Sequence, residues 1–179
     1  ATVKVNGIES NKITAGLLEK IELILEDKSP GVITTIGFKI EGGVYKPDGV
    51  SFFPWGEPAN ASGVTTLYLK AIPLKSSSDS RIDFFISYGN GPVRVVTLNV
   101  VQPTLIVDPT SITFGTVVDL NLSLHDANGR AMNGYLITPA DSDVFAGNAT
   151  ATTGADGSTT LTVSPNAIGT LTLKVPDLL

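Results

Sequence analysis

The sequence predicts an all-β protein made of two tandem antiparallel β-sandwiches. Short runs of β-branched and aromatic residues recur along the whole chain, and glycine, proline, asparagine or aspartate bounds nearly all of them. Composition agrees with this prediction, because 42 % of the 179 residues are apolar, which is enough for packed cores. A chain of this length has room for one large domain or for two small domains of about 90 residues each.

Charged and aromatic residues divide the chain near Pro103. Residues 1–102 hold ten lysines and arginines and ten acidic residues, so this part is neutral. Residues 103–179 carry only Arg130 and Lys174 against seven aspartates, and nine of the twelve aromatic residues precede them. The contrast predicts two domains, 1–102 and 103–179. Because both sides of the joint are extended and proline restricts the backbone, we expect a semi-rigid connection.

The first domain is expected to contain seven short strands separated by turn residues. Turns are predicted where glycine, proline and serine cluster, for example at Pro30-Gly31 and Gly42-Gly43. Seven strands within about 100 residues are typical of a β-sandwich. The expected strands are Thr2–Val5, Lys20–Glu26, Thr34–Ile40, Val50–Phe53, Thr65–Ala71, Ile82–Ser87 and Val93–Val101.

One segment of this domain fits two secondary structures. Leu18, Ile21 and Leu25 have the three- and four-residue spacing of a helix. Ile21, Leu23 and Leu25 also alternate with polar residues as in a strand, although Ile24 interrupts the alternation. Turn residues flank the segment and all its neighbours are predicted strands, so a strand is favoured.

The second domain shows cleaner alternation. Leu120, Leu122 and Leu124 alternate with polar residues up to the turn Asp126-Ala127-Asn128-Gly129. The Asn-Gly pair supplies the positive φ angles that a tight hairpin requires. Other strands of this antiparallel sandwich are expected at Thr104–Val107, Tyr135–Thr138, Ala149–Thr153, Thr159–Val163 and Thr170–Val175.

Four segments of the second domain carry a family resemblance. They are Pro109-Thr110-Ser111-Ile112, LNLSLHDANGRAMNG (120–134), ATTGADGSTTLTV (151–163) and GTLTLKV (169–175). Through them, residues 109–175 resemble the bacterial immunoglobulin-like (Ig-like) repeats of intimin, invasin and related surface proteins, although Ala131 stands where proline is frequent. The resemblance implies an Ig-like sandwich that acts as a stalk module or an adhesive tip and has no catalytic residues. We interpret the first domain as a second Ig-like sandwich, from an unassigned family.

Reactive side chains are scarce in this sequence. It has no cysteine, which excludes disulfides, thiolate zinc sites and cysteine nucleophiles. Its single histidine, His125, precedes Asp126, but neighbouring side chains on a strand point to opposite faces, so a catalytic triad is not expected. No spacing singles out a pair of carboxylates for glycoside chemistry. We therefore expect no enzyme activity and no cofactor.

Acidic loop residues are the only candidates for a metal, and that metal would be calcium. No Asp-x-Asp-x-Asp-Gly loop with a closing glutamate is present. Aspartate and asparagine also favour turns because they bond to their own backbone, and this interpretation explains every candidate, so no metal site is predicted. The candidates are Asp108, Asp126, Asn128, Asp141, Asp143 and Asp156.

An aromatic cluster in the segment Ser51–Pro58 is the best candidate binding site. Phe52, Phe53 and Trp55 lie there around Pro54. Aromatic side chains on a loop can stack on sugar rings or anchor a protein partner. The alternative, which we favour, is that the phenylalanines fill the core while Trp55 covers a sheet edge or a domain interface.

These observations predict a non-catalytic structural or adhesive module of an exported or cell-surface prokaryotic protein, acting as a stalk, spacer or appendage subunit. The expected partners are other protein chains or neighbouring domains of the same surface protein. The alternative is a carbohydrate-binding accessory region of a secreted hydrolase, with a glycan bound by the aromatic segment. A net charge of −5 argues against nucleic acid, and no apolar run is long enough to span a membrane.

Overall fold

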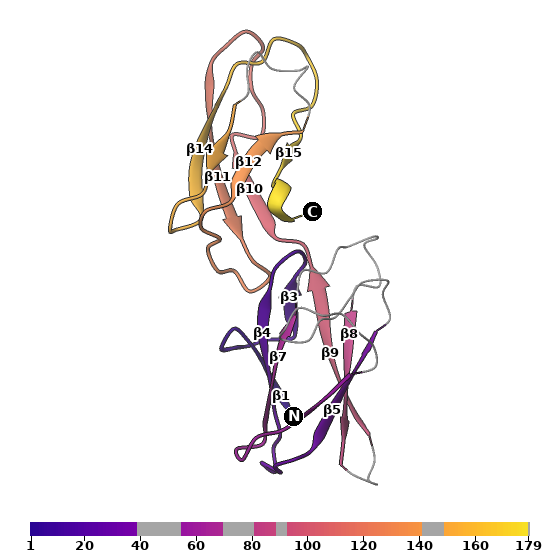
Figure 1. Ribbon diagram of the computed structural model, residues 1–179. Helices are drawn as coiled ribbons and strands as arrows, with labels where there is room; N and C mark the ends of the chain where they lie inside the picture. Colours follow the sequence, from indigo (N-terminus) through magenta and orange to yellow (C-terminus); the bar gives the residue numbers. More distant parts are fainter. Residues whose placement is uncertain (39–54, 70–80, 89–92, 141–148, 179) are drawn as a thin grey trace. The chain divides into compact units, whose positions relative to one another are not determined.

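In the computed structural model, the regular secondary structure of the described residues is almost entirely strand (Figure 1). The only helical element in the described residues is a short 3₁₀ helix, η2 (Pro176–Leu178). This confirms the all-β fold class, and the ambiguous segment is a strand, β4 (Glu19–Ile24). The structure describes residues 1–38, 55–69, 81–88, 93–140 and 149–178, with only the backbone described for 36–38 and 55.

The chain forms two compact units, Ala1–Gln102 and Pro103–Leu179. In the first unit the described strands form a four-stranded sheet, β2-β1-β4-β7, and a five-stranded sheet, β3-β9-β8-β5-β6. With β4, the strands are β1 (Thr2–Val5), β2 (Ile8–Glu9), β3 (Lys12–Thr14), β5 (Ile33–Phe38), β6 (Trp55–Pro58), β7 (Val64–Leu69), β8 (Arg81–Ser87) and β9 (Arg94–Val101). The expected strand Val50–Phe53 lies outside the described residues.

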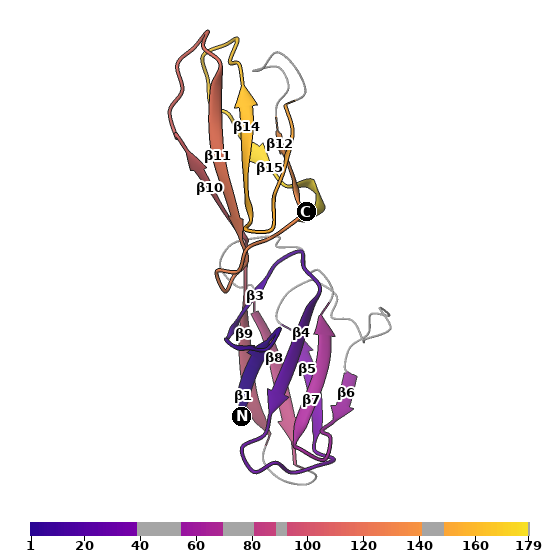
Figure 2. The ribbon, with the colours of Figure 1, turned by 90° about the vertical axis from the view of Figure 1, so that its left-hand side faces the viewer.

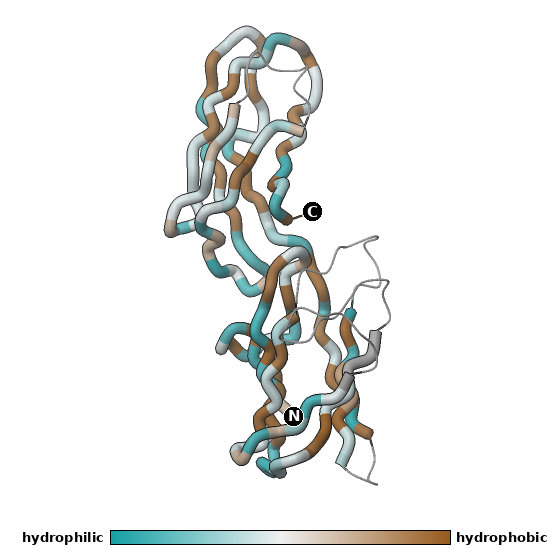
Figure 3. The backbone as a smooth tube through the Cα atoms, in the orientation of Figure 1, coloured by the Kyte–Doolittle hydropathy of each residue, from teal (hydrophilic) through white to brown (hydrophobic). Residues whose placement is uncertain are grey.

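These two sheets pack face to face around one core. Alternate residues of each strand point inward, as the pleat requires. Ile21 on β4 and Leu67 on β7 meet Phe84 on β8 and Leu98 on β9, and all four are fully buried. Hydrophobic and hydrophilic residues alternate along these strands (Figure 3). The first unit is therefore a β-sandwich.

The strand order of this sandwich is Ig-like. One sheet holds the first, second and fifth framework strands, β1-β4-β7. The other holds β5-β8-β9 with β6 added beside β5, as in Ig domains with an extra edge strand. Among the described strands, all pairs are antiparallel except β3 and β9, which run parallel from the pair Lys12↔Asn99 to Thr14↔Val101. The parallel pair is an addition to the predicted antiparallel arrangement.

The second unit also has two sheets, with six described strands against nine in the first unit, and Figure 2 shows their arrangement. Its sheets are β10-β11-β14 and β13-β12-β15. Inward-facing Leu120 and Leu122 of β11 meet Ile137 of β12, while Leu161 and Val163 of β14 complete the buried cluster. The strands are β10 (Thr104–Asp108), β11 (Val118–His125), β12 (Leu136–Pro139), β13 (Ala151–Thr152), β14 (Ser158–Val163) and β15 (Leu173–Lys174).

The last predicted strand is much shorter than the sequence alternation suggested. We expected Thr170–Val175, but only Leu173–Lys174 is a strand. It pairs with β12 through Thr138↔Lys174 and Pro139↔Leu173. One further bond extends this contact, from the N–H of Ala140 to the carbonyl of Thr172 at 2.7 Å.

Candidate functional site

The aromatic segment is only partly described. Phe52 and Phe53 lie outside the described residues. Trp55 is the first residue of β6, and its backbone lies opposite Ile36 of β5. In the described part of the first unit, β6 pairs with β5 and forms an edge of the five-stranded sheet. The segment therefore leads directly into an edge strand.

Apolar side chains also lie on the outer face of the five-stranded sheet, across β5, β8 and β9. Ile33 on β5 is 50 % exposed and Val95 on β9 is 54 % exposed, with the partly buried Phe85 on β8. Gly56 lies against this face, because a Cβ atom there would be 2.9 Å from Cγ2 of Ile33. We did not predict this face, although β8 carries apolar residues at successive as well as alternate positions.

A polar group lies on the same outer face. Oγ1 of Thr97 donates a hydrogen bond to Oδ1 of Asp83 at 2.7 Å, directly across β8 and β9. Nη2 of Arg81 lies 3.5 Å from Oδ2 of Asp83. The hydrogen bond from Thr97 joins β9 to β8 and stabilises their pairing, whereas Arg81 and Asp83 both lie on β8. This cluster resembles a structural network, with no second carboxylate beside it in the described residues.

His125 ends β11 and does not form a triad. Its Nδ1 lies 3.4 Å from Oγ of Ser123, which shares its face of the strand. Oδ1 of Asp126 accepts hydrogen bonds from the backbone N–H groups of Asn128 at 2.8 Å and Arg130 at 2.9 Å. The carboxylate that a triad would need is therefore engaged in the turn. Asp126 therefore bonds to the backbone of its own turn and does not orient the ring of His125.

The acidic residues considered for calcium also serve turns. Oδ1 of Asp156 accepts a hydrogen bond from the N–H of Ser158 at 3.0 Å. Hydrogen bonds from the side chain and backbone of Ser158 lower the pKa of Asp156 below its ordinary value. Asp141 and Asp143 lie outside the described residues. Within the described ranges, no group of three or more histidine, aspartate or glutamate side chains is placed to hold a metal ion.

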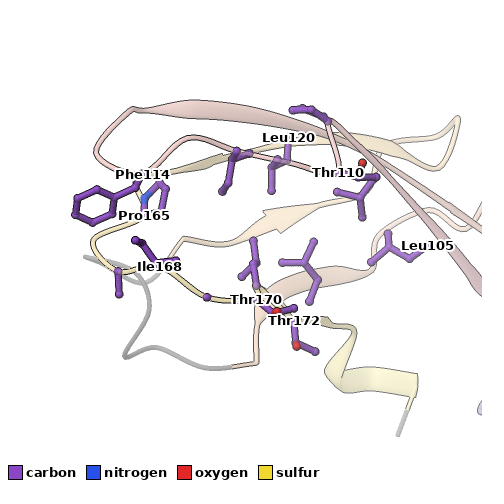
Figure 4. Close-up of a pocket in the computed structure, with 15 residues that line it drawn as sticks. Leu105, Thr110, Phe114, Leu120, Pro165, Ile168, Thr170 and Thr172 are labelled. Carbon is purple, nitrogen blue, oxygen red and sulfur yellow. The ribbon is translucent and has the colours of Figure 1, made fainter.

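A cavity of about 750 Å³ opens between the two sheets of the second unit (Figure 4). Its lining is mostly apolar and includes no ionisable residue. Figure 4 shows Phe114, Pro165 and Ile168 gathered at one end and Leu105 at the other. Phe114 is 56 % exposed and Ile168 is 92 % exposed, so this end is open. The cavity can receive apolar groups, and its lining has threonine hydroxyls but no ionisable side chain that could act as an acid or a base.

Sequence reasoning missed this cavity. A sequence signal for it does exist, because Leu171, Leu173 and Val175 alternate with polar residues, and Leu171 and Leu173 line the cavity. In the described part of the chain, no helix has both the length and the apolar character needed to cross a bilayer.

Comparison with solved structures gives matches of low sequence identity. The chain is similar to invasin, a bacterial integrin-binding protein, at 19 % identity and a TM-score of 0.34, with 98 % of this chain and 36 % of that chain covered. It is also similar to the D0–D1 domain of intimin, at 11 % identity and a TM-score of 0.36, with 98 % of this chain and 90 % of that chain covered. A third similar structure is that of domains 4 and 5 of the S-layer protein SbsC, at 17 % identity and a TM-score of 0.33, with 97 % of this chain and 90 % of that chain covered.

The matches include both proteins whose repeats residues 109–175 resemble. The chain spans about a third of the invasin structure. No protein-family model and no curated protein sequence matches the chain.

Proposed function

We propose that this chain is a non-catalytic structural or adhesive module of an exported or cell-surface protein, acting as a stalk, spacer or appendage subunit. One observation carries the proposal. Asp126 and Asp156, two of the polar residues that sequence analysis singled out, accept backbone hydrogen bonds within their own turns. A pair of sandwiches built in this way presents loops and edges to partners without needing titrating groups.

The connection between the two units supports a role as a spacer. β9, the last strand of the first sandwich, ends at Val101, and β10, the first strand of the second, begins at Thr104. Gln102 and Pro103 are the only residues between them, and the proline ring fixes one of the four φ and ψ angles of this joint. A long flexible linker is therefore absent between these units.

The adhesive contact is proposed at the aromatic segment. Phe52, Phe53 and Trp55 precede or begin β6, and among the described strands β6 is at the edge of its sheet, next to the exposed Ile33 on β5. An edge strand and neighbouring aromatic residues suit another protein chain or a neighbouring domain of the same surface protein. A glycan on the same residues would instead favour the accessory region of a secreted hydrolase.

The location of the protein on the cell surface is tested with an antibody raised against the purified chain. On intact cells of the organism that produces it, we expect labelling without permeabilisation and loss of the signal after external protease. An antibody against a cytosolic enzyme serves as the control for intact membranes. Labelling that requires permeabilisation would contradict an exported module.

The contact is tested by measuring capture of candidate protein and polysaccharide ligands on surfaces coated with the chain. Trp55→Ala should lower capture by about tenfold or more, because aromatic anchors dominate interface energetics. Tyr68→Ala is the matched control, since Tyr68 is an exposed aromatic residue on the other sheet. Circular dichroism checks that both variants fold. Equal capture by both variants would remove the aromatic segment from the proposal, and selective glycan capture would favour the accessory region.

A further inference from the structure

Four asparagines of the chain are followed directly by glycine, namely Asn6, Asn90, Asn128 and Asn133. An asparagine before glycine is open to a spontaneous reaction, because glycine has no side chain to keep its backbone nitrogen away from the asparagine carboxamide. The reaction closes a ring between the two residues and releases ammonia. Asn90 lies outside the described residues, so the structure compares three of these pairs.

The first pair, Asn6 and Gly7, is held against strand β4. It is the two-residue loop between β1 and β2, with φ angles of +46° and +85°. Oδ1 of Asn6 accepts a hydrogen bond from the N–H of Lys20 at 2.8 Å, and the N–H of Asn6 donates to the carbonyl of Lys20 at 2.7 Å. The carboxamide can therefore reach the nitrogen of Gly7 only after Asn6 leaves Lys20.

The second pair, Asn128 and Gly129, is held inside the turn that follows β11. The N–H of Asn128 donates to Oδ1 of Asp126 at 2.8 Å. The N–H of Gly129 donates to the carbonyl of Asp126 at 3.0 Å. Asn128 is also half-buried. Rotation of Asn128 toward the nitrogen of Gly129 therefore requires the turn to open at both bonds.

The third pair, Asn133 and Gly134, is held at one point. Both residues are exposed, and within the described part of the chain the carboxamide of Asn133 makes no hydrogen bond. A Cβ atom on Gly134 would meet nothing within 4 Å, so the space beside its nitrogen is open. The N–H of Gly134 donates to the carbonyl of Thr153 at 2.9 Å, and this single bond has to open before the ring can close.

Thr153 also fixes the backbone on both sides of the third pair. This threonine is only 3 % exposed. Its Oγ1 donates to the carbonyl of Met132 at 2.6 Å and accepts from the N–H of Tyr135 at 3.0 Å. The N–H of Thr153 donates to the carbonyl of Tyr135 at 3.0 Å. These bonds therefore depend on the length of the backbone between Met132 and Tyr135.

We propose that Asn133 is a site of spontaneous deamidation, and that in the folded chain it reacts faster than Asn6 and Asn128. The backbone nitrogen of Gly134 attacks Cγ of Asn133 and gives up its proton, a C–N bond forms, and the side-chain amide leaves as ammonia. Solvent water then opens the cyclic imide. Attack of water at Cγ gives aspartate, and attack at the backbone carbonyl of Asn133 gives isoaspartate.

The products differ in their effect on the second unit. Each adds a negative charge to a unit that already carries seven aspartates against Arg130 and Lys174. Isoaspartate also adds one atom to the backbone between Met132 and Tyr135, because the chain then runs through Cβ and Cγ. We expect the bonds from Thr153 to Met132 and Tyr135 to weaken in this form. This inference does not depend on the proposed function.

The first experiment incubates the whole 179-residue chain in mildly alkaline buffer. Peptide mapping by mass spectrometry measures the exchange of NH₂ for OH at each asparagine, and isoaspartyl methyltransferase labels the isoaspartate product. Asn133 should react about fivefold faster than Asn6 or Asn128, the factor expected from one hydrogen bond fewer to open. In urea the three pairs should react at similar rates. Asn133→Gln should abolish modification at this position, since ring closure is slower with the longer side chain.

A second experiment measures the consequence for the fold. Anion-exchange chromatography separates the isoaspartate form, and hydrogen exchange is followed at Tyr135 and Thr153. Both amides should exchange faster than in the unreacted chain. Asn133→Asp is the matched control, because it has the same added charge without the added backbone atom, and it should keep their protection. The N–H of Lys20, bonded to Asn6 in the other unit, should be unchanged.

Four results would overturn the proposal. In the folded chain, Asn133 could react no faster than Asn6 or Asn128. A preference for Asn133 that persists in urea would place its cause in the sequence and not in the fold. Aspartate without isoaspartate would show direct hydrolysis without attack by Gly134. Unchanged exchange at Tyr135 in the isoaspartate form would show that backbone length does not control the bonds of Thr153.

Discussion

Arg130 and Asp126 are joined three times across the turn that follows β11. The N–H of Arg130 donates to Oδ1 of Asp126 at 2.9 Å, and Nε of Arg130 lies 3.2 Å from Oδ2. The N–H of Asp126 in turn donates to the carbonyl of Arg130 at 2.9 Å. The residue beside the only histidine of the chain is therefore a turn-stabilising residue, with its carboxylate largely buried.

We expect Asp126→Ala to destabilise the second unit by about 1–3 kcal/mol, because the N–H groups of Asn128 and Arg130 lose their acceptor. Asp126→Asn keeps an oxygen at this position and should cost less. Urea unfolding followed by circular dichroism measures both. Identical stability of Asp126→Ala and the unchanged chain would contradict this role.

Asp156 is expected to titrate below its ordinary value of 3.8, because hydrogen bonds from Ser158 stabilise the carboxylate. Its pKa is lower in the folded than in the unfolded chain, so the ionised group stabilises the fold above the unfolded pKa. That contribution is lost as the pH falls through the folded pKa. Carboxyl-carbon NMR titration measures the shift. Ser158→Ala should raise the pKa only partly, since the backbone N–H remains, and a titration at the ordinary value would contradict the bond.

Tyr135 is expected to titrate above its ordinary value of 10.0, because burial disfavours the phenolate and the negative charge of Asp177 adds to this effect. The resulting stability is complete below the unfolded pKa and is lost as the pH rises through the folded pKa. Ultraviolet absorbance of the phenolate, compared with Tyr135→Phe, isolates this residue from the other three tyrosines. Asp177→Asn should lower the pKa slightly. No change would show that η2 does not lie beside Tyr135.

Much of the strand framework could be predicted from the sequence because strand patterns are local. Val118–His125 alternates leucine with polar residues over its whole length, and the alternation identified both the strand and its inward face. The segment around Ile21 was harder, since its spacing also fits a helix. Pairing with β1 and β7 decides between them, and those partners are distant in sequence.

Three short strands could not be predicted. β2 has two residues and β3 has three, so neither is long enough to show alternation. β3 forms because Lys12–Thr14 lies parallel to the end of β9, almost ninety residues later. β6 contains a glycine and a proline, which are poor strand residues and suit an edge.

For the candidate sites too, features that depend on neighbouring residues could be predicted, and features that depend on residues distant in sequence could not. The turn roles of Asp126 and Asp156 follow from their own sequence neighbourhoods and were predicted. The cavity of the second unit is lined by residues of β10 and β15, which are distant in sequence, and only the pairing of strands in the fold reveals that they lie around one space. The binding role of Phe52, Phe53 and Trp55 remains a prediction.

Truncating a core leucine to alanine is expected to cost more stability in the first unit, where the site is fully buried, than beside the cavity of the second unit. Leu98→Ala in the first unit should cost about 2–5 kcal/mol, because it leaves a cavity in a fully buried site. Leu173→Ala in the second unit should cost clearly less, since its side chain borders space that is already open. Urea unfolding compares the two, with hydrogen exchange assigning each loss to its unit. Equal losses would indicate that the core of the second unit is as closed as that of the first.

Gly63 is expected to tolerate substitution less than the other glycines that the structure describes in the first unit. Its φ is +71°, and a Cβ atom there would lie 2.5 Å from Cα of Lys28, which is backbone and cannot rotate away. Gly31 has a similar φ of +75° but has nothing within 4 Å of its Cβ position. Gly31→Ala therefore measures the cost of the left-handed backbone alone, about 1 kcal/mol.

Gly63→Ala should cost roughly 3 kcal/mol or more, because the clash adds to the same backbone strain. It should also weaken the hydrogen bond from the N–H of Leu25 to the carbonyl of Gly63, which is 2.9 Å long. Urea unfolding gives the two free energies, and hydrogen exchange at Leu25 reports the local loss. If both variants lose the same stability, the contact between Gly63 and Lys28 imposes no constraint and φ alone explains the glycine.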